Sequence, residues 1–230
     1  MQQFDNKIIN KKISESKIFL RSLSLDYKKN FINIKNKISD EVEEIENLIK
    51  NKKKIIPEIY YQEIVSNSID NNLVDLVKKR GCVIIRDVFD RKQVKFWNDE
   101  LANYIEKNNY YEDQKEKAGL DKYFSDLKSG KPQIFGLYWS KPQVEVRQSK
   151  NMALTKTWLN KLWINKFNGK IIFLPDKELV YADRVRRREA GDSSLGLSPH
   201  CDAGSVERWI DAAYQKIYEP IFSDNFENYD

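Results

Sequence analysis

The residues best suited to chemistry lie close together near the end of the chain. The segment Ser198–Asp202 places His200, the only histidine in 230 residues, two positions before Asp202. In an extended strand, residues i and i+2 point to the same face, so this imidazole and this carboxylate would lie side by side. A non-haem Fe(II) facial triad uses two histidines and one carboxylate and leaves coordination positions open. The pair therefore supplies two of the three ligands of such a site.

Two interpretations of this pair stay open. Because the chain has a single histidine, either the pair is not a metal site or the third ligand lies outside this polypeptide. Taken alone, a histidine beside a carboxylate on a partly buried strand is more often a simple hydrogen-bonded pair than a metal site. The context favours the functional interpretation, because Pro199 and Gly204 flank the pair and Cys201 would face the opposite side of the strand.

A group of arginines precedes the pair and forms a second candidate site. Guanidinium forks match carboxylates in a bidentate manner, so these side chains could hold a carboxylate ligand or an anionic substrate. An equally good interpretation is a solvated strand end with ion pairs to neighbouring acidic residues. Strand alternation predicts that three of the arginines share one face, although it does not say which face lines a pocket. The cluster comprises Arg184, Arg186, Arg187 and Arg188, and the alternating set is Arg184, Arg186 and Arg188.

Composition limits the class of protein. Hydrophobic residues make up 40%, aromatic residues 12% and charged residues 33%, which is ordinary for a globular chain that can bury a core. The net charge of +5 comes from 40 basic and 35 acidic residues, so we expect no nucleic-acid partner. The two cysteines, Cys82 and Cys201, form no disulfide framework or metal knuckle, which favours a cytoplasmic setting. We expect no membrane partner, because no uninterrupted apolar stretch is long enough to cross a bilayer.

The N-terminal part, residues 1–56, is predicted to be a helical extension biased toward Lys, Asn and Ile. Apolar residues between Ile32 and Ile49 recur at helical spacings, and Ser39 with Asp40 resembles a helix cap. We expect a solvated helical extension rather than a coiled coil, because the heptad is not sustained.

The pattern changes after Pro57 to that of a mixed α+β domain. The segment Leu73–Arg80 is predicted to be a helix that ends at Gly81, followed by a short strand over Cys82–Arg86. Asp90 is a predicted cap for the next helix.

Further strands and one more helix are predicted before the candidate metal ligands. Strands are expected over Ile134–Trp139 and Leu179–Arg186, with a helix over Leu154–Phe167 between them. A turn at residues 190–194 would lead into a second strand that carries His200, as in a hairpin of a β-barrel or jelly roll.

Some other polar and aromatic residues are not assigned to the candidate site. The run that contains Gln143, Arg147 and Gln148 is more typical of a surface turn than of a pocket. Aromatic residues such as Trp158 and Trp163 at helical spacing are usually core residues. After Ser205 a short helical segment is expected.

Long segments of the chain resemble a known family. Residues 179–230, especially the runs YADRVRRR and LGLSPHCDAGSVERW, are similar to the DUF1479 family, which belongs to the 2-oxoglutarate- and Fe(II)-dependent oxygenase superfamily. The runs KRGCVIIRDVF and YWSKPQVEVRQ also resemble its segments, so the resemblance extends from about Ile59 to residue 230.

The resemblance implies a fold and a site. It implies a double-stranded β-helix of the jelly-roll or cupin type with packed helices, and it makes His200 and Asp202 the first two iron ligands. It also implies Fe(II) and 2-oxoglutarate as cofactors, with Arg184 and Arg186 as candidates to hold 2-oxoglutarate. The substrate would be a small molecule whose identity the sequence does not indicate.

The chain departs from the family because the distal histidine belongs to a later strand. We therefore expect residues 57–230 to be the N-terminal portion of an oxygenase-like domain, completed by a C-terminal fragment. Such a truncated chain is predicted to be inactive alone, since two ligands bind Fe(II) weakly and half a barrel leaves sheet edges unpaired. The alternative is a non-catalytic binding or interaction protein derived from that fold.

Overall fold

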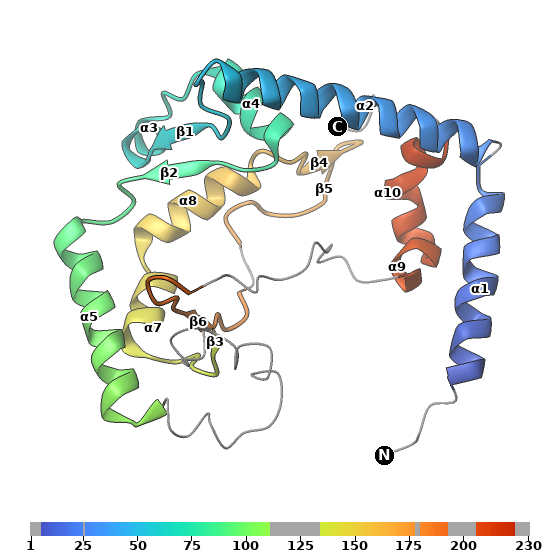
Figure 1. The fold of residues 1–230 in the computed structure, drawn as a ribbon. Helices are drawn as coiled ribbons and strands as arrows, with labels where there is room; N and C mark the ends of the chain where they lie inside the picture. The colour runs from blue at the N-terminus through green and yellow to red at the C-terminus, as the bar shows by residue number, and fades with distance from the viewer. Residues whose placement is uncertain (1–5, 25, 111–133, 178–179, 193–205, 224–230) are drawn as a thin grey trace. The chain divides into compact units, whose positions relative to one another are not determined.

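The chain, in a computed structural model, is described over residues 6–24, 26–110, 134–177, 180–192 and 206–223. It divides into two compact units. One combines the described parts of residues 1–55 and 197–230, and the other comprises those of residues 56–196 (Figure 1). Each unit is described by itself below.

The first unit is helical. Its two long helices follow one another at the start of the chain, and a helix with no glycine or proline can continue over many turns. The helices are α1 (Asn6–Ser22), α2 (Tyr27–Lys50), α9 (Val206–Ile210) and α10 (Ala212–Phe222).

The helix expected over residues 32–49 is confirmed, but its predicted start is wrong. Ser39 and Asp40 lie inside α2, and the cap is Asp26, whose side chain accepts a hydrogen bond from the Lys29 amide at 3.0 Å. Helix-forming residues precede Ser39 without a break, so the helix extends back to the earlier capping aspartate.

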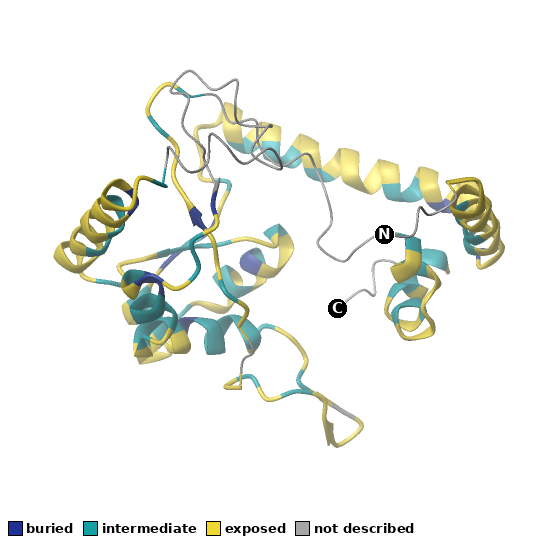
Figure 2. Cartoon of the chain, turned by 90° about the horizontal axis from the view of Figure 1, so that it is seen from below, coloured by how far each residue is buried: buried dark blue, intermediate teal, exposed yellow. Residues whose placement is uncertain are grey.

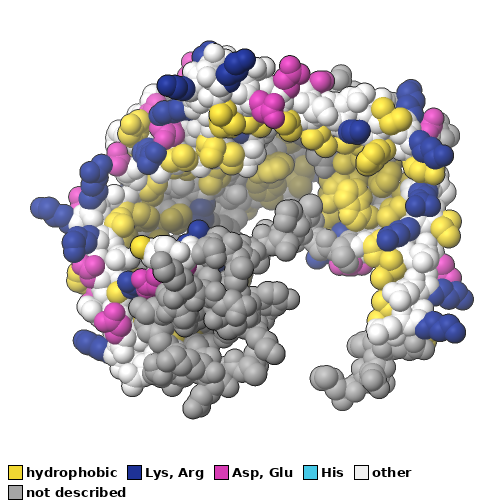
Figure 3. Space-filling model, in the orientation of Figure 1, with side chains coloured by type: hydrophobic (Ala, Val, Ile, Leu, Met, Phe, Trp, Pro, Cys, Tyr) yellow, Lys and Arg dark blue, Asp and Glu magenta, His cyan; other side chains and the backbone are white. Residues whose placement is uncertain are grey.

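Helices from the N-terminal and C-terminal parts of the sequence pack together within this unit. Helix α9 packs against α1, and α10 packs against both α9 and α2. The buried Asn30 of α2 donates hydrogen bonds to Ser24 Oγ at 2.8 Å and to the Phe222 carbonyl at the end of α10 at 2.8 Å. Figure 3 shows hydrophobic side chains gathered on the side of α1 and α2 that faces α10, with Lys and Arg on the outer side. The N-terminal helices therefore contact the C-terminal helices α9 and α10 within this unit.

The second unit begins with a parallel pair of strands connected through two helices. Strand β1 pairs with β2 in the register Glu58↔Ile84, and Ile59 at the centre of β1 is fully buried. The predicted helix before Gly81 is confirmed, because Gly81 ends it with a φ of 64°. These elements are β1 (Glu58–Tyr60), α3 (Tyr61–Ser66), α4 (Asn71–Arg80) and β2 (Ile84–Arg86).

The rest of this unit surrounds a small core. The Asp90 cap is confirmed by hydrogen bonds from two amides of the following helix, α5. Ile105 of α5 packs with Phe135 and Val185, which belong to a pair of short antiparallel strands. The elements are α5 (Arg91–Lys107), β3 (Ile134–Phe135), α7 (Lys141–Arg147), α8 (Lys150–Asn160), β4 (Lys166–Phe167), β5 (Lys170–Ile171) and β6 (Val185–Arg186).

Polar contacts attach α7 and α8 to the earlier elements of the unit. Trp97 of α5 donates a hydrogen bond to Glu145 of α7 at 2.6 Å. Asn151 of α8 donates to the Val88 carbonyl at 2.6 Å and accepts from the Tyr61 hydroxyl of α3 at 3.1 Å.

Three predicted elements differ from the structure. The strand expected over residues 179–186 is limited, in its described part, to Val185–Arg186. The strand expected over residues 134–139 is limited to Ile134–Phe135, because Ser140 and the residues before it lead into α7. The helix expected over residues 154–167 is α8, which begins and ends earlier, at Lys150 and Asn160. Trp163 therefore lies outside the helix with 72% of its surface exposed, so the prediction that it is a core residue is wrong.

The described strands form three two-stranded sheets, β1-β2, β3-β6 and β4-β5. Few described residues are buried, as the scarcity of dark blue in Figure 2 shows. The partial double-stranded β-helix stays a prediction, because these short pairs do not test it. None of the described helices is both long and apolar enough to span a membrane.

Candidate functional site

The arginines of the candidate site lie on and beside β6. This strand pairs with β3 in the register Ile134↔Arg186 and Phe135↔Val185. Val185 is buried in the core beside Phe135, whereas Arg184 and Arg186 on either side of it are exposed. The predicted alternation stays a prediction, because the strand comprises only Val185 and Arg186 and the residues on both sides of Val185 are exposed.

Arg184 is positioned by an aromatic ring. Its guanidinium lies 5.6 Å from the centre of the Tyr138 ring, within the range of a cation–π contact. In the part of the chain that the structure describes, neither Arg184 nor Arg186 forms an ion pair. Both guanidiniums can therefore present donors to an anion.

The neighbouring Arg187 behaves differently. Its Nε lies 3.4 Å from a carboxylate oxygen of Glu189, in an ion pair at the end of the strand. This ion pair matches the alternative interpretation of the arginines as a solvated strand end. The match holds for Arg187 and not for the whole cluster.

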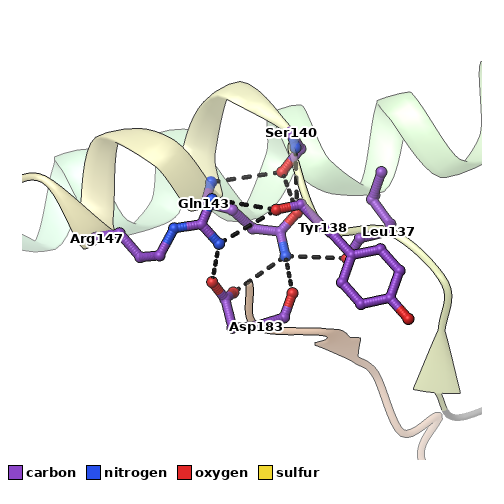
Figure 4. Close-up of polar contacts among 6 residues, drawn as sticks. All are labelled: Leu137, Tyr138, Ser140, Gln143, Arg147 and Asp183. Carbon is purple, nitrogen blue, oxygen red and sulfur yellow. Dashed lines mark hydrogen bonds and ion pairs between the residues drawn. The ribbon is translucent and has the colours of Figure 1, made fainter. Parts of the chain in front are cut away.

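A polar network fixes the residue just before Arg184. Figure 4 shows Gln143 and Arg147 of α7 pointing toward Asp183. Gln143 Nε2 donates to the Asp183 carbonyl at 2.9 Å, to its carboxylate at 3.0 Å and to the Leu137 carbonyl at 3.0 Å. Arg147 forms an ion pair with Asp183 and donates to the Tyr138 carbonyl at 3.2 Å. The network connects α7, the segment after β3 and the start of β6, and we call it the Asp183 clamp.

The electrostatics of the clamp favour an ionised Asp183. Partial burial acts to raise the pKa of this carboxyl, but the hydrogen bonds from Gln143 and Arg147 together outweigh it and hold the pKa below its ordinary value. The clamp therefore contains a carboxylate at neutral pH, with Arg147 as its counter-ion. It orients the segment that carries Arg184 and Tyr138.

The sequence interpretation missed Gln143 and Arg147 as structural residues. The segment predicted as a turn is the start of α7, with Ser140 as its N-cap and Gln143 completing a capping box. Ser140 Oγ and Gln143 Oε1 lie 2.9 Å apart, and both residues are buried. The Ser-x-x-Gln spacing with a proline in the first turn was the sequence signal for this helix.

The predicted iron ligands, His200 and Asp202, lie outside the described residues, as does Cys201. The predicted second strand of the hairpin lies there as well. Within the described ranges, no three His, Cys, Asp or Glu side chains are grouped as a metal site would need. The assignment of His200 and Asp202 stays a prediction.

Comparison with known proteins defines the class of this chain. Residues 7–230 match the model of the Gig2-like family, and the chain belongs to that family. A curated relative, the uncharacterized protein YbiU of Escherichia coli K12, is 34% identical over 218 residues, which cover 95% of this chain and 51% of the relative. The resemblance noted in the sequence is thus confirmed at the level of the family.

Solved structures of similar proteins also match nearly the whole of this chain. A crystal structure described as the "Putative Oxidoreductase" from Salmonella typhimurium LT2 is 34% identical, with a TM-score of 0.83 over 100% of this chain and 54% of its own. The structure of GlcNAc Inducible Gene 2, GIG2 (DUF1479), from Candida albicans is 25% identical, with a TM-score of 0.71 over 94% of this chain and 44% of its own. The chain therefore spans about half the length of the relatives that it matches.

Proposed function

We propose that this chain is the metal-ligating half of an oxidoreductase, a dioxygenase that depends on Fe(II) and 2-oxoglutarate and acts on a small molecule. The proposal is supported by membership of the Gig2-like family and by similarity to a Salmonella structure described as a putative oxidoreductase. The oxygenase type itself derives from the sequence around His200 and Asp202.

The donors that this chain offers suit the proposed metal. A neutral imidazole and a carboxylate are the ligand types of the Fe(II) facial triad, so His200 and Asp202 fit two of its three positions. We expect the third ligand from the part of a Gig2-like protein that these 230 residues do not include. When bound, iron and 2-oxoglutarate would supply the oxidation of substrate by O2.

The observation that carries the role of this chain is the pair of exposed guanidiniums beside β6. Arg184 and Arg186 are both exposed on either side of the buried Val185, Arg184 lies against Tyr138, and the Asp183 clamp fixes the backbone immediately before them. Two exposed arginines this close together in the sequence can bind a dicarboxylate through bidentate hydrogen bonds. We assign them to the carboxylate of 2-oxoglutarate.

Metal binding and turnover test the proposal. The chain alone, supplied with Fe(II), ascorbate and 2-oxoglutarate, should form no succinate, because two ligands hold iron weakly. A protein that contains both halves should form succinate, and His200→Ala should abolish its iron binding without changing its circular dichroism. Succinate formation by the chain alone would refute its predicted inactivity, and unchanged iron binding in His200→Ala would remove this residue from the ligand set.

The arginines are tested in the same two-half protein. Arg184→Ala and Arg186→Ala should each raise the KM for 2-oxoglutarate by about tenfold or more, since a hydrogen bond to a charged group contributes about 1.5–3 kcal/mol. Arg187→Ala is the matched control, because Arg187 already pairs with Glu189. Equal KM values in all three variants would contradict the assignment.

A second candidate is a non-catalytic binding protein derived from the same fold. Large aromatic side chains on the surface of the second unit favour it, since Trp139 is 73% exposed and Tyr181 90% exposed. The iron-binding experiment separates the two candidates. A dioxygenase should lose iron binding in His200→Ala, whereas a non-catalytic binding protein has no iron binding to lose.

A further inference from the structure

The hairpin of β4 and β5 is specified by its own turn. Asn168 and Gly169 connect the two strands, with φ values of 48° and 75°. An Asn-Gly pair with both residues at positive φ is typical of the tight turns whose twist matches that of the flanking strands. The turn therefore favours the pairing of these two short strands.

The same hairpin and its flanks expose large apolar side chains. Five such side chains occur within twelve residues, and each has about half or more of its surface exposed. They are Trp163 (72%), Ile164 (63%), Ile171 (59%), Ile172 (61%) and Leu174 (48%). A cluster of this kind marks an interaction surface, because water-exposed apolar area is unfavourable. We call residues 163–174 the hairpin surface.

The backbone of the hairpin surface is also available for pairing. Strands β4 and β5 pair only with each other among the described strands. The Ile172 amide donates to the Asn165 carbonyl at 2.9 Å and extends the pairing by one step. The outer edges can accept a further strand, which would bury the apolar side chains and pair the free backbone groups together.

The base of the hairpin surface is anchored. Asn160 at the end of α8 donates through Nδ2 to the Pro175 carbonyl at 2.9 Å, which closes the segment at its two ends. An anchored hairpin loses less conformational entropy when it binds than a free loop would. This favours a docking role over an accidental exposure of apolar residues.

Length and charge indicate what docks there. This chain aligns along its whole length with about half of the Salmonella structure, so relatives contain a second half of similar size. Exposed lysines surround the hairpin surface at positions 161, 166, 170 and 177, and they outnumber the exposed Asp176 beside it. A strand with apolar side chains and an acidic rim would complement this surface.

We propose that the hairpin surface is the docking site for a strand from the other half of a Gig2-like protein, the half that these 230 residues do not contain. The inference rests on the proposed function, which requires such a half to complete the site. The inference adds where the two halves would contact each other, namely at the edge of the β4–β5 hairpin.

The test is binding of the 230-residue chain to a polypeptide that comprises the part of the Salmonella relative outside the aligned half. Calorimetry should show a complex, and Ile172→Asp should weaken it at least about tenfold, as expected for a charge placed in an apolar contact. The matched control is Ile38→Asp on α2, because Ile38 is 58% exposed, and it should change the affinity less than about twofold. Hydrogen exchange of the wild-type chain should slow at residues 165–172 when the partner is added, a measurement that does not depend on how a variant folds.

Three outcomes would overturn the proposal. These are no binding up to about 100 μM, no protection of residues 165–172 in the complex, or an equal effect of Ile38→Asp and Ile172→Asp. The chain could instead associate with itself and not bind the other half. If Ile172→Asp removed that self-association, the hairpin surface would be assigned to a second copy of this chain. Binding needs no metal, so a complex that forms without succinate production would contradict the oxygenase proposal and leave the docking site intact.

Discussion

At the scale of single residues, Gln143 is a buried polar side chain of the second unit that donates several hydrogen bonds. It is 7% exposed, and its amide group donates to two backbone carbonyls and a carboxylate. A buried acceptor left without a partner costs about 1–3 kcal/mol, so this side chain stabilises the unit by keeping both carbonyls paired.

Replacement of Gln143 tests this role. Gln143→Leu should lower the free energy of unfolding by about 2–4 kcal/mol, because it leaves the carbonyls of Leu137 and Asp183 without their donor. Urea denaturation followed by circular dichroism measures the change. The control is Gln148→Leu, an exposed position at the end of α7, which should change stability by about 0.5 kcal/mol or less. Equal losses in the two variants would contradict the role of the clamp.

The Asp183 clamp also predicts a pH dependence. Because the folded pKa of Asp183 lies below its ordinary value, ionised Asp183 stabilises the folded state above the unfolded pKa of about 3.9. That contribution is lost as the pH falls through the lower, folded pKa. The stability difference between the wild type and Asp183→Asn should therefore be full at pH 7 and shrink below about pH 4.

Urea denaturation at several pH values measures this difference. Arg147→Gln provides the control, because it removes the counter-ion and should return the pKa of Asp183 toward its ordinary value, as seen by carboxyl NMR. A stability difference that does not vary with pH would show that the carboxylate charge is not what stabilises the clamp.

At the scale of elements, the contact between α2 and α10 holds the two ends of the chain in one unit. Asn30 is 7% exposed and donates to the carbonyl of Phe222, one of the last carbonyls of α10. Carbonyls at a helix end have no partner within the helix, so a side chain from another helix can satisfy them.

Asn30→Ala should lower the free energy of unfolding of this unit by about 1–3 kcal/mol, because it leaves a helix-end carbonyl unpaired. It should also speed hydrogen exchange in α10. Asn36→Ala in the exposed part of α2 is the matched control and should leave both quantities unchanged. Exchange in α10 that is insensitive to Asn30→Ala would mean that this hydrogen bond does not hold α10, and that other contacts do, such as the stack of Trp209 of α9 on Tyr218 of α10.

Several elements could be predicted because their signals are local. The Gly81 stop, the Asp90 cap and the helical pattern over residues 32–49 depend on residues within a few positions of one another. The errors arose where two local signals competed, as at Ser39 inside α2 and at Trp163 beyond the end of α8. In both cases the sequence pattern was real, but a cap or stop elsewhere decided the boundary.

At the scale of the whole molecule, the chain combines a modest core with much exposed apolar surface. The fully buried large side chains of the described residues are Phe135, Ile59 and Ile105, whereas many isoleucines and tryptophans are exposed. Together with its coverage of about half of each relative, this supports the proposal that a second half completes the protein.

The sequence by itself determined the family, the candidate ligand pair His200 and Asp202, and the helices and strands with strong local caps, because each depends on residue types at short spacing. The tertiary structure decided what distant segments do together. Only folding brings Gln143 and Arg147 to Asp183, pairs β3 with β6 so that Arg184 and Arg186 face outward, and joins Asn30 to the end of α10. These contacts link residues 36 to 192 positions apart, and their energies depend on burial and geometry that no short stretch of sequence contains.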